Sequence, residues 1–277
     1  MELIPTAQRL LGQLGIHADV NAFLIVFGLA VARVATALSL APFFGGSTVS
    51  GQVRTGLAVI LAATLTPYLT GAPQTGPMNV LIFVALLLKE VMIGAVIGFV
   101  TQLVFLAVQV AGTLIDNGRG MNQPAYVAPQ LPGHLSALGQ LKFQAAIVLF
   151  LAMNGHLMFL NTLHASFAHL PVLTFPKFPP GGFAFVDQMA RITGGTISIG
   201  IQLAAPVLLS LFMVDVAFGA LGKIASQINV HQESQPVKAM AGLGVLLLAS
   251  GFLMSRMQQI LGDMMNSVGA ILHALRP

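Results

Sequence analysis

Long stretches without a charged residue are the feature that most constrains the fold of this chain. Asp, Glu, Lys and Arg are absent from residues 34–53, 55–88, 91–115, 143–176, 192–214 and 239–255. A helix that spans a membrane needs about 20 mostly apolar residues. Charged residues make up 7% of the chain, against about 25% in a typical soluble domain. We therefore predict an integral membrane protein.

Proline and glycine divide the apolar stretches into predicted helices. The pattern predicts about six, over residues 20–41, 53–70, 79–115, 139–165, 191–222 and 236–262. We expect an all-α fold and one membrane-embedded helical domain over 1–277, with an N-terminal part of about 20–135 and a C-terminal part of about 136–265. Residues 1–19 lack the apolar core of a secretory signal, so we expect the first apolar helix to be retained.

Several classes of function are excluded by what the sequence lacks. The chain has no cysteine, which rules out disulfides and thiolate chemistry. Its net charge of +4 is spread thinly, so nucleic acid is not expected as a partner. The usual hydrolase, metalloprotease, phosphate-loop and dinucleotide motifs are missing. Three histidines have no acidic companion at helical spacing, namely His156, His164 and His169. We expect no enzymatic activity, no cofactor and no metal site.

The basic residues that flank the predicted helices show no bias. Six crossings would place equal numbers of them on the two membrane faces. Positive charges normally gather on the cytoplasmic side of a membrane protein. The equal division suggests that many of these helices pack against other protein instead of crossing lipid in the ordinary way.

Charged residues inside the apolar helices need partners. Arg33 lies midway along the first predicted helix, where a central charge costs about 2.5–3.5 kcal/mol. Two readings stay open for it: a partner carboxylate or polar assembly surface, and a side chain that reaches a helix end. Lys89 and Glu90 are neighbours and point about 100° apart on a helix. We expect them not to pair with each other, and each to find a partner on another helix or subunit.

Other polar and small residues also interrupt the apolar pattern. Asp215 ends an apolar run, which favours helix-end capping or a contact to a neighbouring subunit. Gly94 and Gly98 form a pair that lets two helices approach closely. Asn154 and His156 flank a glycine, and we expect a kink with side-chain hydrogen bonds there.

The segment from Asp116 to about Ser136 is the most informative irregular stretch. It is rich in glycine and proline and mixes polar with apolar residues. Irregular backbone at membrane depth survives only where protein buries it or where it lines a watery cavity. The segment is therefore either an exposed loop or a constriction, and composition leaves both open.

An ordered set of motifs resembles one protein family over about residues 20–255. These motifs are Arg33, Ala41-Pro42-Phe43-Phe44, Arg54, Lys89-Glu90, Gly94, Gly98, Ala111-Gly112, Asn154-Gly155-His156, Ser166-Phe167, Pro171, Asp215, Gly219, Gln227-Ile228-Asn229-Val230 and Pro236-Val237-Lys238. Together they are similar to the FliR/SctT family of type III secretion export-apparatus proteins. Ile115-Asp116 with Arg119-Gly120 looks more like the injectisome branch than the flagellar branch. The sequence departs from the family at Ser226, where proline is usual, and in the more polar residues 231–235.

The resemblance implies a fold and a role. It implies helical hairpins in a hetero-oligomeric export-gate ring, within the secretion basal body of the bacterial inner membrane. Implied partners are FliP/SctR-like, FliQ/SctS-like and FlhB/SctU-like membrane subunits, and unfolded secretion substrates. It places a plug or gating loop at Asp116, Asn117, Gly118, Arg119, Gly120, Met121, Pro124 and Pro129. We assign assembly and helix packing to Arg33, Lys89, Glu90, Gly94, Gly98, Asn154, His156, Asp215, Gln227, Asn229 and Lys238.

Two other functions compete with the channel subunit. An ion-coupled secondary transporter would use Glu90 or Asp215, and a proton relay at Glu90 is the simplest form of it. Such a transporter should show broken helices at matching positions of two related halves, and the sequence shows no such repeat. A membrane scaffold without a pore is the third alternative.

Overall fold

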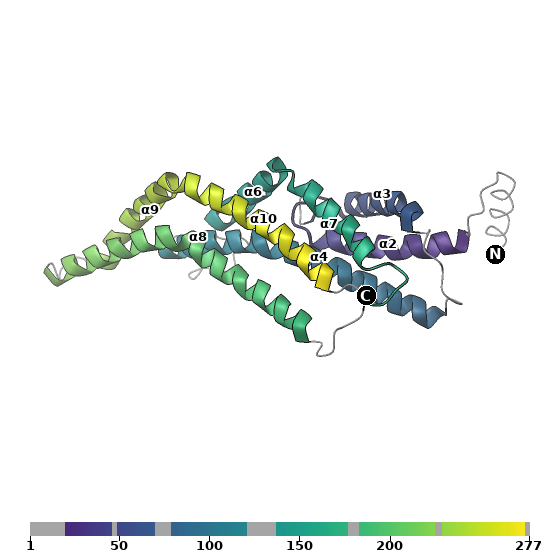
Figure 1. Ribbon diagram of the computed structural model, residues 1–277. Helices are drawn as coiled ribbons and strands as arrows, with labels where there is room; N and C mark the ends of the chain where they lie inside the picture. The colour runs from purple at the N-terminus through teal and green to yellow at the C-terminus, as the bar shows by residue number, and fades with distance from the viewer. Residues whose placement is uncertain are drawn as a thin grey trace. The chain divides into compact units, whose positions relative to one another are not determined.

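The computed structural model describes residues 20–45, 49–69, 79–120, 137–176, 183–224 and 229–274. These residues form helices and, within those ranges, no strand (Figure 1). The helices are α2 (Val20–Leu40), α3 (Gly51–Leu69), α4 (Val80–Gly118), α6 (Ala137–Ala152), α7 (Gly155–His169), α8 (Phe183–Ile224), α9 (Val230–Leu248) and α10 (Ser250–Ala274). The all-α prediction is confirmed.

Two predicted helices are each divided in the structure, so the count of six was only approximate. The fourth predicted helix is the pair α6 and α7, bent by 73°, and the sixth is the pair α9 and α10, bent by 63°. Three unbroken helical segments are long and apolar enough to cross a membrane, namely Asn21–Leu40, Val80–Gly118 and Val186–Ile224. If each bent pair is one span, the described residues hold up to 5 candidates.

The break between α6 and α7 has a local backbone cause. Asn154 has a φ of 58°, in the left-handed region that Asn tolerates better than most residues. Its N–H donates to the carbonyl of Leu151 at 3.1 Å, a tightened last turn. The expected kink is confirmed. The expected side-chain hydrogen bonds are not all there, because His156 Nδ1 is buried without a hydrogen-bond partner.

The described helices gather into two compact units. The first contains α2, α3, α4 as far as Gln102, α7 from His156, and the end of α10. Within it, α3 packs against α2, and its buried residues Ala58, Ala62 and Thr66 recur every four positions along one face. This spacing is what a helix needs to bury a single stripe.

The second unit contains α4 from Leu103, α6, α8 from Asp187, α9 and α10 as far as Met264. Phe105 is fully buried in it, with its ring centroid 5.4 Å from that of Phe150. Gly200 of α8 lies so close to α4 that an added Cβ would stand 3.1 Å from the carbonyl oxygen of Ala107. Small residues thus allow α8 to approach α4 within this unit.

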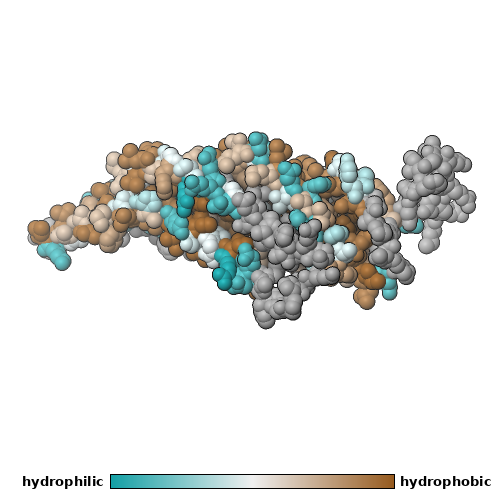
Figure 2. All heavy atoms as spheres, viewed as in Figure 1, coloured by the Kyte–Doolittle hydropathy of each residue, from teal (hydrophilic) through white to brown (hydrophobic). Residues whose placement is uncertain are grey.

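Large apolar side chains remain exposed on most of the helices. On α8, Ile197, Leu209 and Phe212 are 58%, 63% and 58% exposed. Figure 2 shows hydrophobic residues over much of the visible surface of α9. Soluble monomers rarely expose large continuous apolar patches. The surface therefore fits a membrane protein that lipid or other subunits cover.

Candidate functional site

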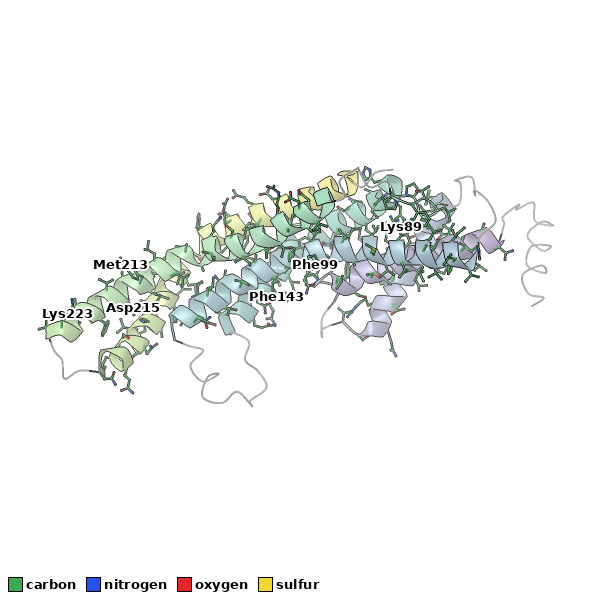
Figure 3. The ribbon with its side chains drawn as sticks, turned by 90° about the horizontal axis from the view of Figure 1, so that it is seen from below. Lys89, Phe99, Phe143, Met213, Asp215 and Lys223 are labelled. Carbon is green, nitrogen blue, oxygen red and sulfur yellow. The ribbon has the colours of Figure 1, made fainter. Side chains whose placement is uncertain are left out.

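A buried charge cluster lies in the first unit and consists of Arg33, Lys89 and Glu90. Arg33 and Glu90 are 0% exposed and Lys89 is 7% exposed. Arg33 comes from the middle of α2, and its two partners are adjacent on α4, where Figure 3 labels Lys89. Buried charges in proteins are paired, and this cluster pairs all three.

Arg33 uses every part of its guanidinium. Nε and Nη2 donate to the two carboxylate oxygens of Glu90, the latter at 2.9 Å. Nη1 donates to Ser166 Oγ at 3.1 Å, and Nη2 also donates to the carbonyl of Leu170 at 2.8 Å. The guanidinium carbon stands 4.1 Å from the ring centroid of Phe167, a favourable cation–π distance. The open question about Arg33 is therefore answered: it has a partner carboxylate and does not reach a helix end.

The prediction that Lys89 and Glu90 do not pair with each other was wrong. Lys89 Nζ lies 2.7 Å from Glu90 Oε1. The angular separation on the helix is real, but the four-carbon lysine side chain is long enough to turn toward the same buried point. The prediction of a partner on another helix is correct for Glu90, which binds Arg33 of α2. Lys89 instead binds carbonyls of the non-helical segment just after α7.

Two glycines allow α2 and α4 to approach closely enough for this pairing. A Cβ added at Gly94 would meet the carbonyl of Arg33 and stand 3.1 Å from the Cβ of Thr36. A Cβ added at Gly98 would stand 2.6 Å from the Cβ of Leu40 and 2.8 Å from the carbonyl oxygen of Ala37. The predicted close approach at Gly94 and Gly98 is therefore present, between α4 and α2.

A second polar group lies in the second unit, and we call it the loop-base cluster: Asp116, Arg119, the backbone of Leu138 and the backbone of Ala239. The N–H of Leu138 donates to Asp116 Oδ2 at 2.8 Å. Asp116 is 2% exposed and belongs to the last turn of α4, whereas Leu138 is in the first turn of α6. A carboxylate at a helix N-terminus satisfies a free N–H and is favoured by the helix dipole. Asp116 therefore caps α6 and joins it to the end of α4.

Arg119 extends the loop-base cluster to α9. Its Nη1 lies 3.5 Å from Asp116 Oδ1, and its Nη2 donates to the carbonyl of Ala239 at 3.0 Å. The stem of Arg119 passes Gly242, where an added Cβ would stand 2.7 Å from Arg119 Cδ. Gly120 has a φ of 72° and contacts the Gln235 side chain. The end of α4 is thus held against α9.

Asp215 does not cap a helix end, so the first of its two predicted roles is wrong, and the contact to a neighbouring subunit stays a prediction. It lies inside α8, nine positions before the helix ends at Ile224, and forms an ion pair with Lys238 of α9. Figure 3 labels Asp215 and Lys223 on this part of α8. The sequence placed the end of the apolar run at Asp215, but a helix continues through a charge when a partner on the next helix balances it.

The remaining predicted residues fall outside these clusters. Asn117 is exposed, and Gly118 lies against Leu208 and Leu211 of α8, 3.1 Å from each for an added Cβ. Asn229 precedes α9 without a side-chain capping bond. Met121, Pro124, Pro129 and Gln227 lie outside the described residues.

The described residues hold no group of three His, Cys, Asp or Glu that could bind a metal ion. The buried charges described above join segments that are distant in the sequence. Sequence reasoning did not assign roles to Ser166, Phe167 and the carbonyls of residues 170–174. The signal was available in part, because Ser166-Phe167 and Pro171 belong to the motif set that resembles the family.

The known proteins that this chain resembles are bacterial export or translocation proteins. The sequence profile of bacterial export proteins, family 1, matches residues 24–264. Flagellar biosynthetic protein FliR of Bacillus subtilis is 28% identical, with 82% of this chain and 85% of that protein covered. FliR of Pectobacterium carotovorum subsp. carotovorum is 31% identical, with 78% and 81% covered. Yop proteins translocation protein T of Yersinia pestis is 25% identical, with 91% and 96% covered.

Proposed function

This chain belongs to family 1 of the bacterial export proteins, and from that premise we propose that it is a non-enzymatic subunit of the type III secretion export gate. There it helps to form and to plug the channel that passes unfolded proteins across the bacterial inner membrane. Its relatives are flagellar and type III secretion export proteins, so its role is in a secretion apparatus. The gate, the plug and the absence of catalysis are the parts that we propose.

The observation that carries the proposal is the family match over residues 24–264, which includes nearly every described helix. The apolar, exposed faces of these helices support it, because a subunit of a membrane complex needs such faces. We propose FliP/SctR-like, FliQ/SctS-like and FlhB/SctU-like proteins as the subunits that cover some of them. Relatives bear names from both flagellar and Yop secretion systems, so the proposal covers both, and the resemblance to the injectisome branch stays a prediction.

The loop-base cluster supports the proposed plug. Asp116 binds the N–H of Leu138, so the two helices that flank residues 121–136 are joined at the base of that segment. Arg119 adds α9 to the same base. A plug must be held at a fixed place, and a buried ion pair and helix cap at its base supply that anchoring.

The contacts of the two acidic candidates weigh against the ion-coupled transporter. Both oxygens of Glu90 are bound by cations, Arg33 and Lys89. Asp215 is paired with Lys238. A coupling carboxylate has to exchange its ion or proton during each cycle, which these ion pairs oppose.

Purification in mild detergent tests the proposed function. The tagged chain is expressed either alone or together with its FliP-like and FliQ-like neighbours from the same genome. We expect the chain alone to aggregate or be degraded, and the co-expressed chain to elute in one complex with both neighbours. A stable monomer that binds a small solute would contradict the proposal and favour a transporter. A matched control co-expresses the chain with an unrelated membrane protein, which should not rescue it.

A further inference from the structure

The side chain of Lys89 ends in a shell of four oxygen atoms. Its Nζ lies 2.7 Å from Glu90 Oε1 and 3.0, 2.7 and 2.9 Å from the carbonyl oxygens of Pro171, Val172 and Thr174. An ammonium group has only three N–H donors. The four oxygens outnumber these donors. The arrangement therefore resembles the rings of carbonyl oxygens that surround a monovalent cation in ion channels.

The charges around the shell point to the same conclusion. Glu90 contributes the only carboxylate in the shell, and Arg33 binds that carboxylate as well. Two cations therefore share one carboxylate, and three backbone carbonyl dipoles add to the balance of the ammonium. These carbonyls follow the C-terminal end of α7, where the helix dipole also favours a positive charge.

The backbone of residues 171–174 depends on the cation in turn. Three carbonyl oxygens directed at one point repel one another unless a positive charge stands between them. Within the segment itself, the N–H and the hydroxyl of Thr174 both donate to the carbonyl of Pro171, at 3.3 and 3.2 Å. Lys89 thus binds three carbonyls of this segment, whereas these two internal bonds share one carbonyl.

We infer that the carbonyls of Pro171, Val172 and Thr174, together with Glu90 Oε1, form a binding site for a primary ammonium ion, and that Lys89 is its tethered occupant. A free alkylammonium of the right size can then replace the side chain. Access is available, because Thr174 and Phe175 are exposed, and because the neutral amine form of such a compound crosses membranes.

Chemical rescue in membranes tests this inference on the full-length chain. Lys89→Ala leaves room for both the ammonium and part of the side-chain stem, and ethylammonium supplies both. Lys89→Met fills the stem volume without a charge and is the matched control variant. Tetramethylammonium at the same concentration is the matched control ion, because it carries the charge but has no N–H donor. Membranes are heated, solubilised, and the soluble chain is measured by immunoblot to give a thermal midpoint.

We expect both variants to lower the midpoint. Ethylammonium should reverse most of the decrease in thermal midpoint of Lys89→Ala and none of the decrease of Lys89→Met. Tetramethylammonium should raise the midpoint of neither variant, and the wild-type midpoint should respond to neither ion. An equal response of both variants to ethylammonium, or a wild-type midpoint for Lys89→Ala without any ion, would overturn the inference. If Lys89→Ala does not accumulate, the amount of chain in cells grown with ethylammonium replaces the midpoint, and failure to recover that amount also overturns it.

Discussion

Arg33 on α2 and Glu90 on α4 form a two-point ion pair in which both side chains are fully buried, although 57 positions separate them in the sequence. The pair fixes the register of the two helices, because a shift of either helix would separate guanidinium and carboxylate. Lys89, Ser166 and the carbonyl of Leu170 complete the contacts around it. One buried polar group thereby joins three helices that are distant in the sequence.

Replacing the carboxylate of this pair should destabilise the chain strongly. Glu90→Gln leaves two buried cations without a counter-charge, and breaking a buried ion pair in this way costs about 3–5 kcal/mol. We expect less chain in the membrane and a lower thermal midpoint, both measured by immunoblot. Asp187→Asn is the matched control, because its pair with Arg191 is exposed, and it should change neither quantity. Normal accumulation of Glu90→Gln combined with pH-insensitive export would instead make Glu90 a proton relay.

The close approach of α2 and α4 predicts a sharp contrast between two glycines. Gly98→Val would force its side chain into Leu40 and the backbone of Ala37, and overpacking of this kind costs about 1–3 kcal/mol. Gly28→Ala on α2 meets nothing within 4 Å and gains helix propensity of up to about 1 kcal/mol. Thermal midpoints should therefore fall for Gly98→Val and stay level or rise for Gly28→Ala. Equal midpoints would mean that the two helices are not in contact at Gly98.

Asp116 acts both as a helix cap and as an ion-pair partner, and two substitutions separate these roles. Asp116→Ala removes both, and leaving the Leu138 N–H without an acceptor and Arg119 without its carboxylate should cost about 1–3 kcal/mol. Asp116→Asn keeps an oxygen for Leu138 but loses the charge, so its midpoint should lie between those of wild type and Asp116→Ala. If Asp116→Asn is as unstable as Asp116→Ala, the cap contributes little and the ion pair dominates.

The pair between Asp215 and Lys238 predicts recovery on charge exchange. Asp215→Lys places two lysines together and Lys238→Asp two carboxylates, so each single change should lower the midpoint. The double exchange restores opposite charges and should recover part of the loss. Because the Asp215 side chain is 49% exposed, we expect a coupling of at most about 1 kcal/mol. Strictly additive losses in this double-mutant cycle would show that the pair contributes nothing.

The sequence predicted the helices well and their breaks partly. Charge-free stretches and Pro or Gly punctuation reflect local requirements, so the predicted ranges of α2, α3 and α4 lie near the observed ones. Helix α8 begins at Phe183, well before its predicted start at 191. The bend at Asn154 was also visible, because Asn next to Gly opposes a continuous helix. The bend between α9 and α10 was not predicted, since Ala249 and Ser250 carry no proline and no signal that marks a helix end.

The sequence identified residues of the candidate site but not the contacts between them. Arg33, Lys89 and Glu90 stand out because charges in apolar helices are rare. Their partners could not be predicted, because a backbone carbonyl after α7 carries no sequence signal. The angle between neighbouring helix positions also failed to predict the contact between Lys89 and Glu90, because a lysine side chain is long enough to turn back. The pairing of Asp215 with Lys238 was missed because it depends on how α8 and α9 align.

The most direct test of the proposed gate is the membrane permeability of cells that express a variant of the chain without residues 121–133. Asp116 and Leu138 are joined by a 2.8 Å hydrogen bond, so a short Gly-Ser linker can replace this segment while the loop-base cluster stays intact. We predict that the variant accumulates and assembles like wild type, and that cells expressing it leak ions and take up small dyes that wild-type cells exclude. Unchanged permeability, with normal amounts of assembled chain, would contradict a plug at this position.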